Sequence, residues 1–198
     1  MYLDTTSLSP RELSRLVISC VVPRPIALVT SVSEEGVVNS APFSFFNAVS
    51  SVPPILMIAV DRKNGERKDT SRNILYSKEF VVHIVNEEIG EKMNMTSSNL
   101  PRNESEVILA GFTLTKSMKI RTPRIVESPI HMECSLIQHL ELGSGPIDVI
   151  FVEVLAFHIR DELHHDGRVD PASLQAIGRM GGMNYCRTRD IFEMIRPK

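Results

Sequence analysis

The chain has 198 residues, of which 42% are hydrophobic and 23% are charged. It contains 22 Lys and Arg residues and 24 Asp and Glu residues, which gives a formal net charge of −2. These values are ordinary for a globular protein and predict a single domain, residues 1–198, whose core needs no disulfides. The near-neutral balance argues against a nucleic-acid-binding surface, which usually carries an excess of basic residues.

The composition also predicts neither a membrane-crossing segment nor a secretory leader. No run approaches the roughly 20 apolar residues that a bilayer-spanning helix needs. The N-terminal stretch MYLDTTSLSPRELSR lacks the basic-then-apolar form of a signal peptide. Cys20, Cys134 and Cys186 are widely spaced and form no C-x-x-C pair, which disfavours a disulfide framework or a zinc site. We therefore expect a cytoplasmic protein whose cysteines are small buried hydrophobic residues.

The first part of the chain predicts one helix and then strands. The stretch PRELSRLVISC reads as a capped helix that begins near Pro10. Residues 24–33 (RPIALVTSVS) are β-branched and apolar and end at a turn, and the chain from Val37 onward pairs back as a hairpin. Ile55–Val60 (ILMIAV) is a continuous apolar run, typical of a strand buried on both faces.

Helices and strands alternate in the middle of the chain. Asp69–Ser77 (DTSRNILYS) predicts a short helix capped by Asp69 or Thr70. Phe80–Val85 (FVVHIV) predicts a strand. Asn86–Met95 predicts a second helix with acidic residues in its first turn.

Two long strands dominate the C-terminal half. Pro129–Glu141 and Asp148–Ile159 alternate apolar and polar residues and are joined by a glycine-rich turn, whereas residues 99–124 are polar and punctuated by proline, which indicates loops. Six or seven strands with only short helices favour a barrel over a doubly wound α/β sheet. The predicted fold class is therefore mainly β, a barrel with short flanking helices.

Common catalytic and nucleotide-binding motifs are absent. The chain has no G-x-x-x-x-G-K-S/T loop, no G-x-S-x-G elbow and no H-E-x-x-H pair. It has no G-x-G-x-x-G after a strand, so a Rossmann nucleotide site is unsupported. The one histidine cluster, His164-His165-Asp166, precedes a glycine, and we interpret it as an exposed hairpin tip rather than a metal site.

The segment Asn39–Pro54 (NSAPFSFFNAVSSVPP) is the first of two segments that indicate a ligand site. Small polar side chains beside exposed backbone suit a flat, hydrogen-bonding ligand with an apolar rim. The alternative is a strand that ends in a turn, with the three phenylalanines divided between core and subunit contacts: Phe43, Phe45 and Phe46.

The second segment is a basic turn that leads into the helix at Asp69. Its cations are Arg62, Lys63, Arg67 and Lys68. Cationic side chains, hydroxyls and free amides at a helix N-terminus make an anion site, although a solvated charged turn is the alternative. Only one buried strand separates the two segments. A flat ring on the first and its phosphate at the second would have the shape of a mononucleotide.

Seven segments then match a known family in order along nearly the whole chain. They are PRPIALVTS (Pro23–Ser31), NSAPFSFFNAVSSVPP (Asn39–Pro54), KDTSRNI (Lys68–Ile74), EFVVHIV (Glu79–Val85), EKMNMTS (Glu91–Ser97), SPIHMECSL (Ser128–Leu136) and IGRMGGMNY (Ile177–Tyr185). With these motifs the chain resembles the flavin reductase-like, FMN-binding split-barrel family, in its flavoredoxin-like branch. The resemblance implies a six-stranded Greek-key-type barrel, a homodimer, and FMN held non-covalently near the dimer interface.

By position in these motifs, the resemblance implies the two halves of an FMN site and no catalytic side chain. The ring edge would meet, largely through backbone amides, Ser44, Phe45, Phe46, Asn47, Ala48 and Ser50. The phosphate end would be held by Lys68, Asp69, Thr70 and Arg62, with Asn73 bracing the loop and Arg24 and Asn39 as second-tier candidates. Amides aimed at the N1–C2=O edge would stabilise the anionic reduced ring.

The resemblance further implies an oxidoreductase that reduces flavin or another small acceptor with electrons from NADH or NADPH. Many short-chain members that use NADH carry Gly-Asp-His at the turn before the last long strand, but this turn reads GSGPIDV and has no histidine. The departure favours an alternative, an electron-transfer flavoprotein that exchanges electrons with a partner protein and has no nicotinamide site. A third interpretation is a relative that stores or delivers FMN.

Two residues outside the proposed site keep open interpretations. His131 either lines the nicotinamide side or is a buried structural histidine. Tyr185 either folds over the flavin or packs the C-terminal turn.

Overall fold

Seven antiparallel strands form one curved sheet in the computed structural model, which describes residues 1–197. The strand order is β2-β1-β5-β8-β9-β4-β3. The strands are β1 (Ala27–Val32), β2 (Val38–Phe43), β3 (Phe46–Ser51), β4 (Pro54–Val60), β5 (Glu79–Ile84), β8 (Ile130–Leu142) and β9 (Ile147–Ile159). Short two-stranded ribbons pair β6 (Leu114–Thr115) with β7 (Arg124–Ile125), β10 (His164–His165) with β11 (Arg168–Val169), and β12 (Ile177–Arg179) with β13 (Tyr185–Arg187).

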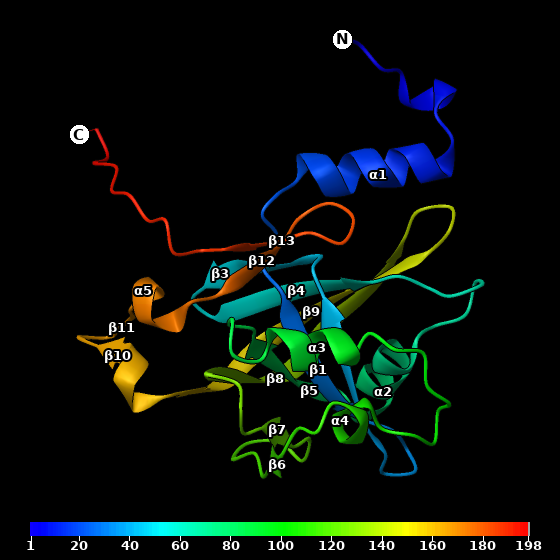
Figure 1. Cartoon of the computed structure of the whole chain (residues 1–198). Helices are drawn as coiled ribbons and strands as arrows, with labels where there is room; N and C mark the ends of the chain where they lie inside the picture. Colours follow the sequence, from blue (N-terminus) through cyan, green and yellow to red (C-terminus); the bar gives the residue numbers. More distant parts are fainter. Residues whose placement is uncertain (198) are drawn as a thin grey trace.

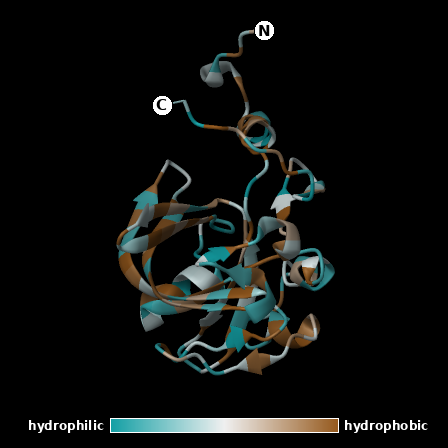
Figure 2. Ribbon diagram, turned by 90° about the vertical axis from the view of Figure 1, so that its left-hand side faces the viewer, coloured by the Kyte–Doolittle hydropathy of each residue, from teal (hydrophilic) through white to brown (hydrophobic). Residues whose placement is uncertain are grey.

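The two edges of the sheet are joined by a very short connection, which curls the sheet into a barrel. β2 and β3 stand at opposite edges, yet only Ser44 and Phe45 separate them in the chain. Three steps of 3.8 Å hold the Cα atoms of Phe43 and Phe46 within about 11 Å of each other. The sheet therefore closes on itself, as Figures 1 and 2 show, and the expected mainly β split barrel is confirmed. It has seven strands rather than six because the segment from Val38 to Ser51 bends at Ser44-Phe45.

Two apolar clusters stabilise the barrel. The inner cluster includes Val29, Ile58, Phe80 and Ile150, all fully buried between facing strands. The outer cluster includes Met93 and packs the helices α3 (Gly90–Met95) and α4 (Glu106–Leu109) against the sheet. Burying such a side chain contributes roughly 1.5–3 kcal/mol.

Strand β4 differs from the prediction that it is buried on both faces. Leu56, Ile58 and Val60 are buried, whereas the side chains between them are only partly covered. β4 is a wall of the barrel, so one face lies on the core and the other lies nearer the surface.

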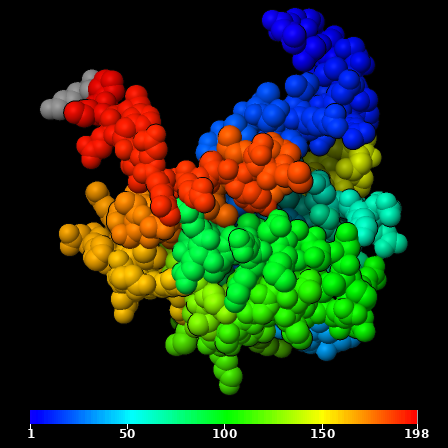
Figure 3. Space-filling view, in the orientation of Figure 1, coloured from blue at the N-terminus to red at the C-terminus, as the bar shows by residue number. Residues whose placement is uncertain are grey.

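Helix α1 (Pro10–Cys20) begins where the sequence predicts. The Ser9 side chain accepts from the Glu12 N–H while Glu12 Oε2 accepts from the Ser9 N–H, which makes a capping box ahead of Pro10. No residue of α1 is buried. Figures 1 and 3 show α1, preceded by η1 (Thr5–Ser7), and the C-terminal tail projecting from the same side of the barrel.

The other predicted helices differ at their starts. Helix α2 (Asp69–Ser77) has Lys68 at its N-cap and no side-chain cap, so the expected cap by Asp69 or Thr70 is wrong. Helix α3 starts only at Gly90 because the residues before it are tied to the C-terminal part of the chain, where Asn86 bridges Ala176. Such a tertiary contact has no local sequence signal.

The C-terminal part follows the expected pattern. β8 and β9 form the predicted long hairpin, and β10 and β11 carry the exposed histidine pair on a second one. η2 (Asp161–Leu163) and α5 (Pro171–Leu174) are single turns. All three cysteines are free, but Cys20 is exposed, so only Cys134 fits the expectation of full burial. Among residues 1–197, no helix combines the length and apolarity needed to cross a membrane.

Candidate functional site

Three neighbouring cavities share Pro42 and Phe43, where β2 ends, as their common floor. The largest, about 520 Å³, lies at the start of α2 and is termed the α2 cavity. The second, about 270 Å³, is bounded by Tyr185 and is termed the Tyr185 cavity. The third, about 230 Å³, is termed the Arg24 cavity. The shared floor makes the three cavities one interrupted groove.

The α2 cavity is built around an uncapped helix N-terminus. Lys68, Asp69 and Thr70 all line it, and no side chain accepts a capping hydrogen bond from the first N–H groups of α2. Ser97 and Arg102 line it from the loops that follow α3. Free N–H groups, the positive end of the helix dipole and cationic side chains together favour an anion here.

The hydroxyl of Thr70 is already used within a buried polar network. It donates to Asn39 Oδ1 at 2.9 Å, and Asn39 Nδ2 donates to Glu106 Oε2, also at 2.9 Å. The N–H of Ser40 donates to the same carboxylate oxygen at 3.1 Å. Burial raises the pKa of Glu106 above its usual range. Thr70 therefore offers an anion its backbone N–H, while Asn39 and Glu106 fix the position of the helix start.

Asn73 lies behind the helix rather than in the α2 cavity. It is 6% exposed, and its Nδ2 donates to Ser31 Oγ on β1 at 3.2 Å. This contact joins α2 to the barrel wall.

Arg24 joins three segments that surround the groove. Its Nη1 donates to the carbonyls of Ile18 and Val21 at 2.6 and 2.7 Å, which are otherwise unpaired at the end of α1. Its Nη2 donates to Met180 O at 3.0 Å, and its Nε donates to Ser44 Oγ at 3.3 Å. Arg24 is 6% exposed, so it positions the bend at Ser44.

Arg179, Tyr185 and Asn94 form one wall of the Tyr185 cavity. The Arg179 guanidinium lies 4.5 Å from the centroid of the Tyr185 ring and also donates to the phenolic oxygen. The Tyr185 hydroxyl in turn donates to Asn94 Oδ1 at 3.3 Å. The ring is thereby held at the edge of the groove, which supports the interpretation in which Tyr185 faces a ligand.

The Arg24 cavity is electropositive. Arg24, Lys68 and Arg179 line it, against the single carboxylate of Asp61. Burial, and then repulsion by the nearby Arg179, lower the pKa of Arg24. This excess of positive charge favours a ligand that carries negative charge or develops it.

Arg62, which the sequence places at the phosphate end, forms ion pairs with carboxylates outside the three cavities. Its Nη2 pairs with Glu141 at 2.6 Å and with the buried Asp148 at 3.0 Å, and Arg67 pairs with the same two carboxylates. His139 Nε2 lies 2.8 Å from Asp148 Oδ1. His139, Glu141 and Asp148 have a spacing that suits a metal ion, but two guanidiniums already balance the carboxylates. Arg62 does not line the three cavities.

The predicted ring-side residues are divided by the bend. Ser44 and Phe45 line the groove, and Phe43 forms its floor, whereas Phe46 points into the barrel core at 9% exposure. The remaining three lie on edge strand β3 and do not line the three cavities: Asn47, Ala48 and Ser50. The structure therefore brings together Ser44, Phe45, Lys68, Asp69 and Thr70.

His131 has a structural environment. Its Nε2 donates to Ser128 O at 2.8 Å and its Nδ1 accepts from Arg124 Nη1 at 3.1 Å. It is 8% exposed and does not line the groove. These contacts favour the interpretation of a buried structural histidine.

Sequence reasoning did not single out four groove residues: Asn94, Ser97, Arg102 and Arg179. Asn94, Ser97 and Arg179 lie in the motifs EKMNMTS and IGRMGGMNY, so the family motifs included these residues but did not indicate what they do. Arg102 lies in the polar stretch interpreted as loops, and only the fold brings it to the α2 cavity.

Comparisons with known proteins agree with this architecture. A model of the flavin reductase like domain matches residues 18–173. The structure is similar to that of nitrilotriacetate monooxygenase component B from Bacillus cereus, with 40% identity, a TM-score of 0.96 and 98% of each chain covered. It is also similar to that of 2-nitrobenzoate 2-nitroreductase from Pseudomonas fluorescens, with 38% identity, a TM-score of 0.92, and 100% of this chain and 96% of that chain covered.

A more distant likeness shows the fold alone. The flavoredoxin of Desulfovibrio vulgaris (Miyazaki F) is 16% identical with a TM-score of 0.77, and 98% of this chain and 97% of that chain are covered. The family model spans most of the chain, and the relatives at about 40% identity cover nearly all of it. The chain therefore belongs to the flavin reductase-like domain family.

Proposed function

We propose that this protein is an FMN-binding oxidoreductase that reduces flavin or another small acceptor with electrons from NADH or NADPH. The observation that carries the proposal is the uncapped N-terminus of α2, with Lys68 beside it, opening into a groove lined by Arg24, Arg179 and Tyr185. Family membership supports a flavin as the ligand, and the two similar structures at about 40% identity are a monooxygenase component and a nitroreductase.

The donor set at α2 fits a flavin phosphate. In this proposal the phosphate receives the first N–H groups of α2, including those of Asp69 and Thr70, together with the Lys68 ammonium. Each such charge-assisted hydrogen bond is roughly twice as strong as a neutral one. Arg102 and Ser97 line the same cavity and complete its cationic and hydroxyl rim.

The ring would lie over Phe43 and against the bend at Ser44 and Phe45, with Tyr185 at its edge. The family motif also assigns the backbone of Asn47, Ala48 and Ser50 to the ring. β3 is an edge strand, so it presents backbone N–H and C=O groups that no neighbouring strand uses. Phe46 and Asn73 would then act by fixing β3 and α2 from the core side.

The flavin supplies the chemistry of hydride and electron transfer, and this chain's residues bind and orient it. Lys68 and the α2 amides fix one end, and Arg24 holds the Ser44 bend in place. The positive charge of Arg24, Lys68 and Arg179 favours negative charge on the bound ligand.

A second candidate function is electron transfer with a protein partner and without a nicotinamide site. The turn between β8 and β9, residues 143–146, contains no histidine, and neither His131 nor His139 lines the groove. We infer a cytoplasmic location for either function, because the three cysteines are free.

The visible spectrum before and after anaerobic addition of NADH or NADPH separates the two functions. A flavin-loaded protein that bleaches promptly supports the reductase. A flavin-loaded protein that stays yellow with both donors, yet bleaches with dithionite, supports the electron carrier. Protein that takes up no added FMN contradicts both.

A further inference from the structure

A short loop between β6 and β7 carries cations that the proposed flavin site does not use. Residues 116–121 (KSMKIR), termed the basic loop, contain Lys116, Lys119 and Arg121, and all three are exposed. No Asp or Glu occurs between residues 107 and 126. Among residues 1–197, no carboxylate forms an ion pair with these three cations. Their charge is therefore available to a ligand.

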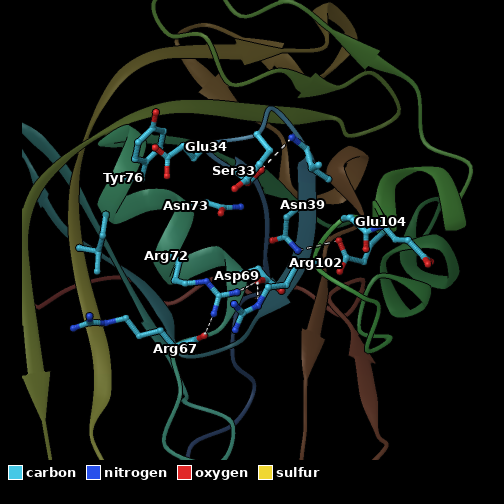
Figure 4. A pocket seen from close by; sticks show the side chains of 15 residues that line it. Ser33, Glu34, Asn39, Arg67, Asp69, Arg72, Asn73, Tyr76, Arg102 and Glu104 are labelled. Atoms are coloured by element: carbon cyan, nitrogen blue, oxygen red, sulfur yellow. Dashed lines mark hydrogen bonds and ion pairs between the residues drawn. The ribbon is translucent and has the colours of Figure 1, made fainter.

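The arginines around the largest cavity are in a different situation. This cavity measures about 620 Å³ and lies beside α2. Arg72 and Arg102 lie against Asp69 there, as Figure 4 shows, and Arg67 pairs with Glu141. The cavity is also lined by more carboxylates than arginines, so it does not suit an anionic ligand. The basic loop differs in both respects.

The basic loop has no regular secondary structure, yet two carboxylates fix its backbone. The N–H groups of Met118 and Lys119 donate to Glu133, which is 0% exposed, at 2.8 and 2.6 Å. The Arg121 N–H donates to Glu79 Oε1 at 2.7 Å. A buried carboxylate is unfavourable unless hydrogen bonds compensate it, and the loop backbone supplies part of that compensation. A loop fixed in this way presents its cations in set positions, which lowers the entropic cost of binding a partner.

Exposed apolar side chains lie within and beside the basic loop. Met118, at the centre of the loop, is 76% exposed. Leu114 on β6 and Val126 just after β7 are exposed as well, and the Val126 N–H donates to Thr113 O across the ribbon. Methionine adapts its shape to different partners and is frequent at binding surfaces. Apolar side chains with charged groups around them are typical of a protein-binding surface.

We propose that the basic loop is a docking surface for an acidic segment of a partner protein. Carboxylates of that segment would pair with the three cations, and an apolar side chain of the segment would cover Met118. This surface is separate from the proposed flavin site and does not depend on it.

The composition of the surface favours a protein over other anionic partners. Its cations are fewer than the roughly 4–8 Lys and Arg of a typical anionic-lipid site. Residues 107–126 contain no Tyr or Trp, and Phe112 is buried, so this stretch offers no exposed aromatic ring on which a nucleic-acid base stacks. The formal net charge of the whole chain is −2, which disfavours a long polyanion.

The basic loop lies apart from the groove and from both terminal segments. No residue between 107 and 126 lines the three groove cavities. Figure 1 shows β6 and β7 at the opposite end of the barrel from α1 and the C-terminal tail. A partner on the basic loop would therefore leave the groove open and the terminal segments accessible.

A peptide of Glu-Glu-Leu repeats is the probe, titrated into the full chain by calorimetry, and a peptide of Gln-Gln-Leu repeats is its uncharged match. The wild type should bind only the acidic peptide. Its affinity should fall at least about tenfold between low and physiological ionic strength, because salt screens exposed charges. The triple variant Lys116→Gln, Lys119→Gln, Arg121→Gln keeps the backbone contacts of the loop and should weaken binding by at least about tenfold.

A matched triple variant controls for net charge. Arg11→Gln, Arg15→Gln and Arg168→Gln remove three exposed cations outside the loop, and peptide affinity should stay within about twofold of the wild type. Urea unfolding checks that both triple variants are folded.

Glu79→Ala separates the shape of the loop from its charge. Removal of this carboxylate makes the surface more positive, so attraction alone would tighten peptide binding. Loss of the contacts from the N–H groups of Arg121 and Thr122 should instead weaken binding by about threefold, because the loop is then less ordered. Tighter binding by this variant would contradict the role of the fixed loop.

Vesicles of phosphatidylserine in phosphatidylcholine, and single-stranded DNA, test the other anionic partners. Both should bind more weakly than the acidic peptide. The proposal is overturned if the wild type does not bind the acidic peptide at low salt, or if the two triple variants bind it equally. Tighter binding of vesicles or DNA, lost in the basic-loop triple variant, would also overturn it.

Discussion

Arg24 and Lys68 line the same cavity, but their environments give them different roles. Arg24 is 6% exposed, and its guanidinium donates to three backbone carbonyls and to Ser44 Oγ. Lys68 is an exposed N-cap whose side chain makes no capping bond. A buried guanidinium with these partners fixes the backbone around the groove, whereas an exposed ammonium remains available to a ligand.

A row of histidines on neighbouring strands gives a residue-level prediction about pH. His83 and His131 are cross-strand partners with ring centroids 5.3 Å apart. His83 Nδ1–H donates to Leu28 O, and His83 Nε2 accepts from the Ile125 N–H, both at 2.9 Å. Burial lowers the pKa of His83 to about 3 and that of His131 to about 4. Both rings are therefore neutral in the folded protein at neutral pH.

Because the folded-state pKa values lie below the unfolded value of 6.5, the unfolded chain binds more protons as pH falls. The contribution of the two neutral histidines to the free energy of unfolding is fully present above pH 6.5. It is lost as the pH falls toward the folded-state pKa of His131, about 4, and then that of His83, about 3. For His83 the loss is at most roughly 4 to 5 kcal/mol. NMR titration should show two of the six histidines without protonation above about pH 5. Six histidines that all titrate near their ordinary pKa would contradict this.

At the scale of elements, the β8–β9 hairpin is fixed to the loop before α2 by ion pairs. Asp148 is fully buried and contacts Arg62, Arg67 and His139. Hydrogen bonds from Arg62, then His139 and Arg67, outweigh the effect of burial and lower the pKa of Asp148. These contacts therefore hold the β8–β9 hairpin and the loop that leads to Lys68 in a fixed position relative to each other.

Asp148→Asn should destabilise the protein by roughly 2 to 4 kcal/mol, because it leaves the partly buried guanidiniums of Arg62 and Arg67 with only Glu141 to balance their charge. The free energy of unfolding in urea measures this. Glu162→Gln on η2 is exposed and should change it by less than about 0.5 kcal/mol. Equal stability of the two variants would contradict the anchoring role.

The sequence predicted most elements because their signals are local. The alternation of apolar and polar residues is sufficient to predict the paired strands β8 and β9. The capping box at Ser9 and Glu12 is sufficient to predict the start of α1. The start of α3 and the uncapped start of α2 depend on distant partners, such as Ala176 for Asn86 and Asn39 for Thr70. The motifs predicted a phosphate end around Lys68, Asp69 and Thr70, but they gave no role to Arg179 or Arg102.

At the scale of the whole molecule, both terminal segments expose apolar surface on the same side (Figures 1 and 3). Leu13, Leu16, Val17 and Cys20 follow the spacing of one helix face in α1, and none is buried. In the C-terminal tail, Phe192 is 78% exposed and Ile195 is 96% exposed. Apolar surface gathered in this way usually marks an interaction site. We therefore propose that the chain forms the homodimer that the family resemblance implies.

Sedimentation equilibrium should therefore give twice the chain mass of 22.2 kDa. Leu16→Asp should shift the protein toward the monomer, because it places a charge in the apolar face of α1. Ser14→Asp adds the same charge outside that face and should leave the dimer intact. A wild-type mass equal to one chain at micromolar concentration would contradict the proposal.

An FMN titration of the flavin-free protein, followed by flavin fluorescence, tests whether the groove from the α2 N-terminus to Tyr185 binds a flavin. Wild type should bind one FMN per chain. Lys68→Ala should weaken the affinity by roughly 10- to 100-fold for the loss of a charge-assisted phosphate contact. Arg121→Ala removes a similar charge at an exposed position outside the groove and should bind FMN as the wild type does. Absence of FMN binding, or equal affinities of Lys68→Ala and wild type, would show that this groove is not the flavin site.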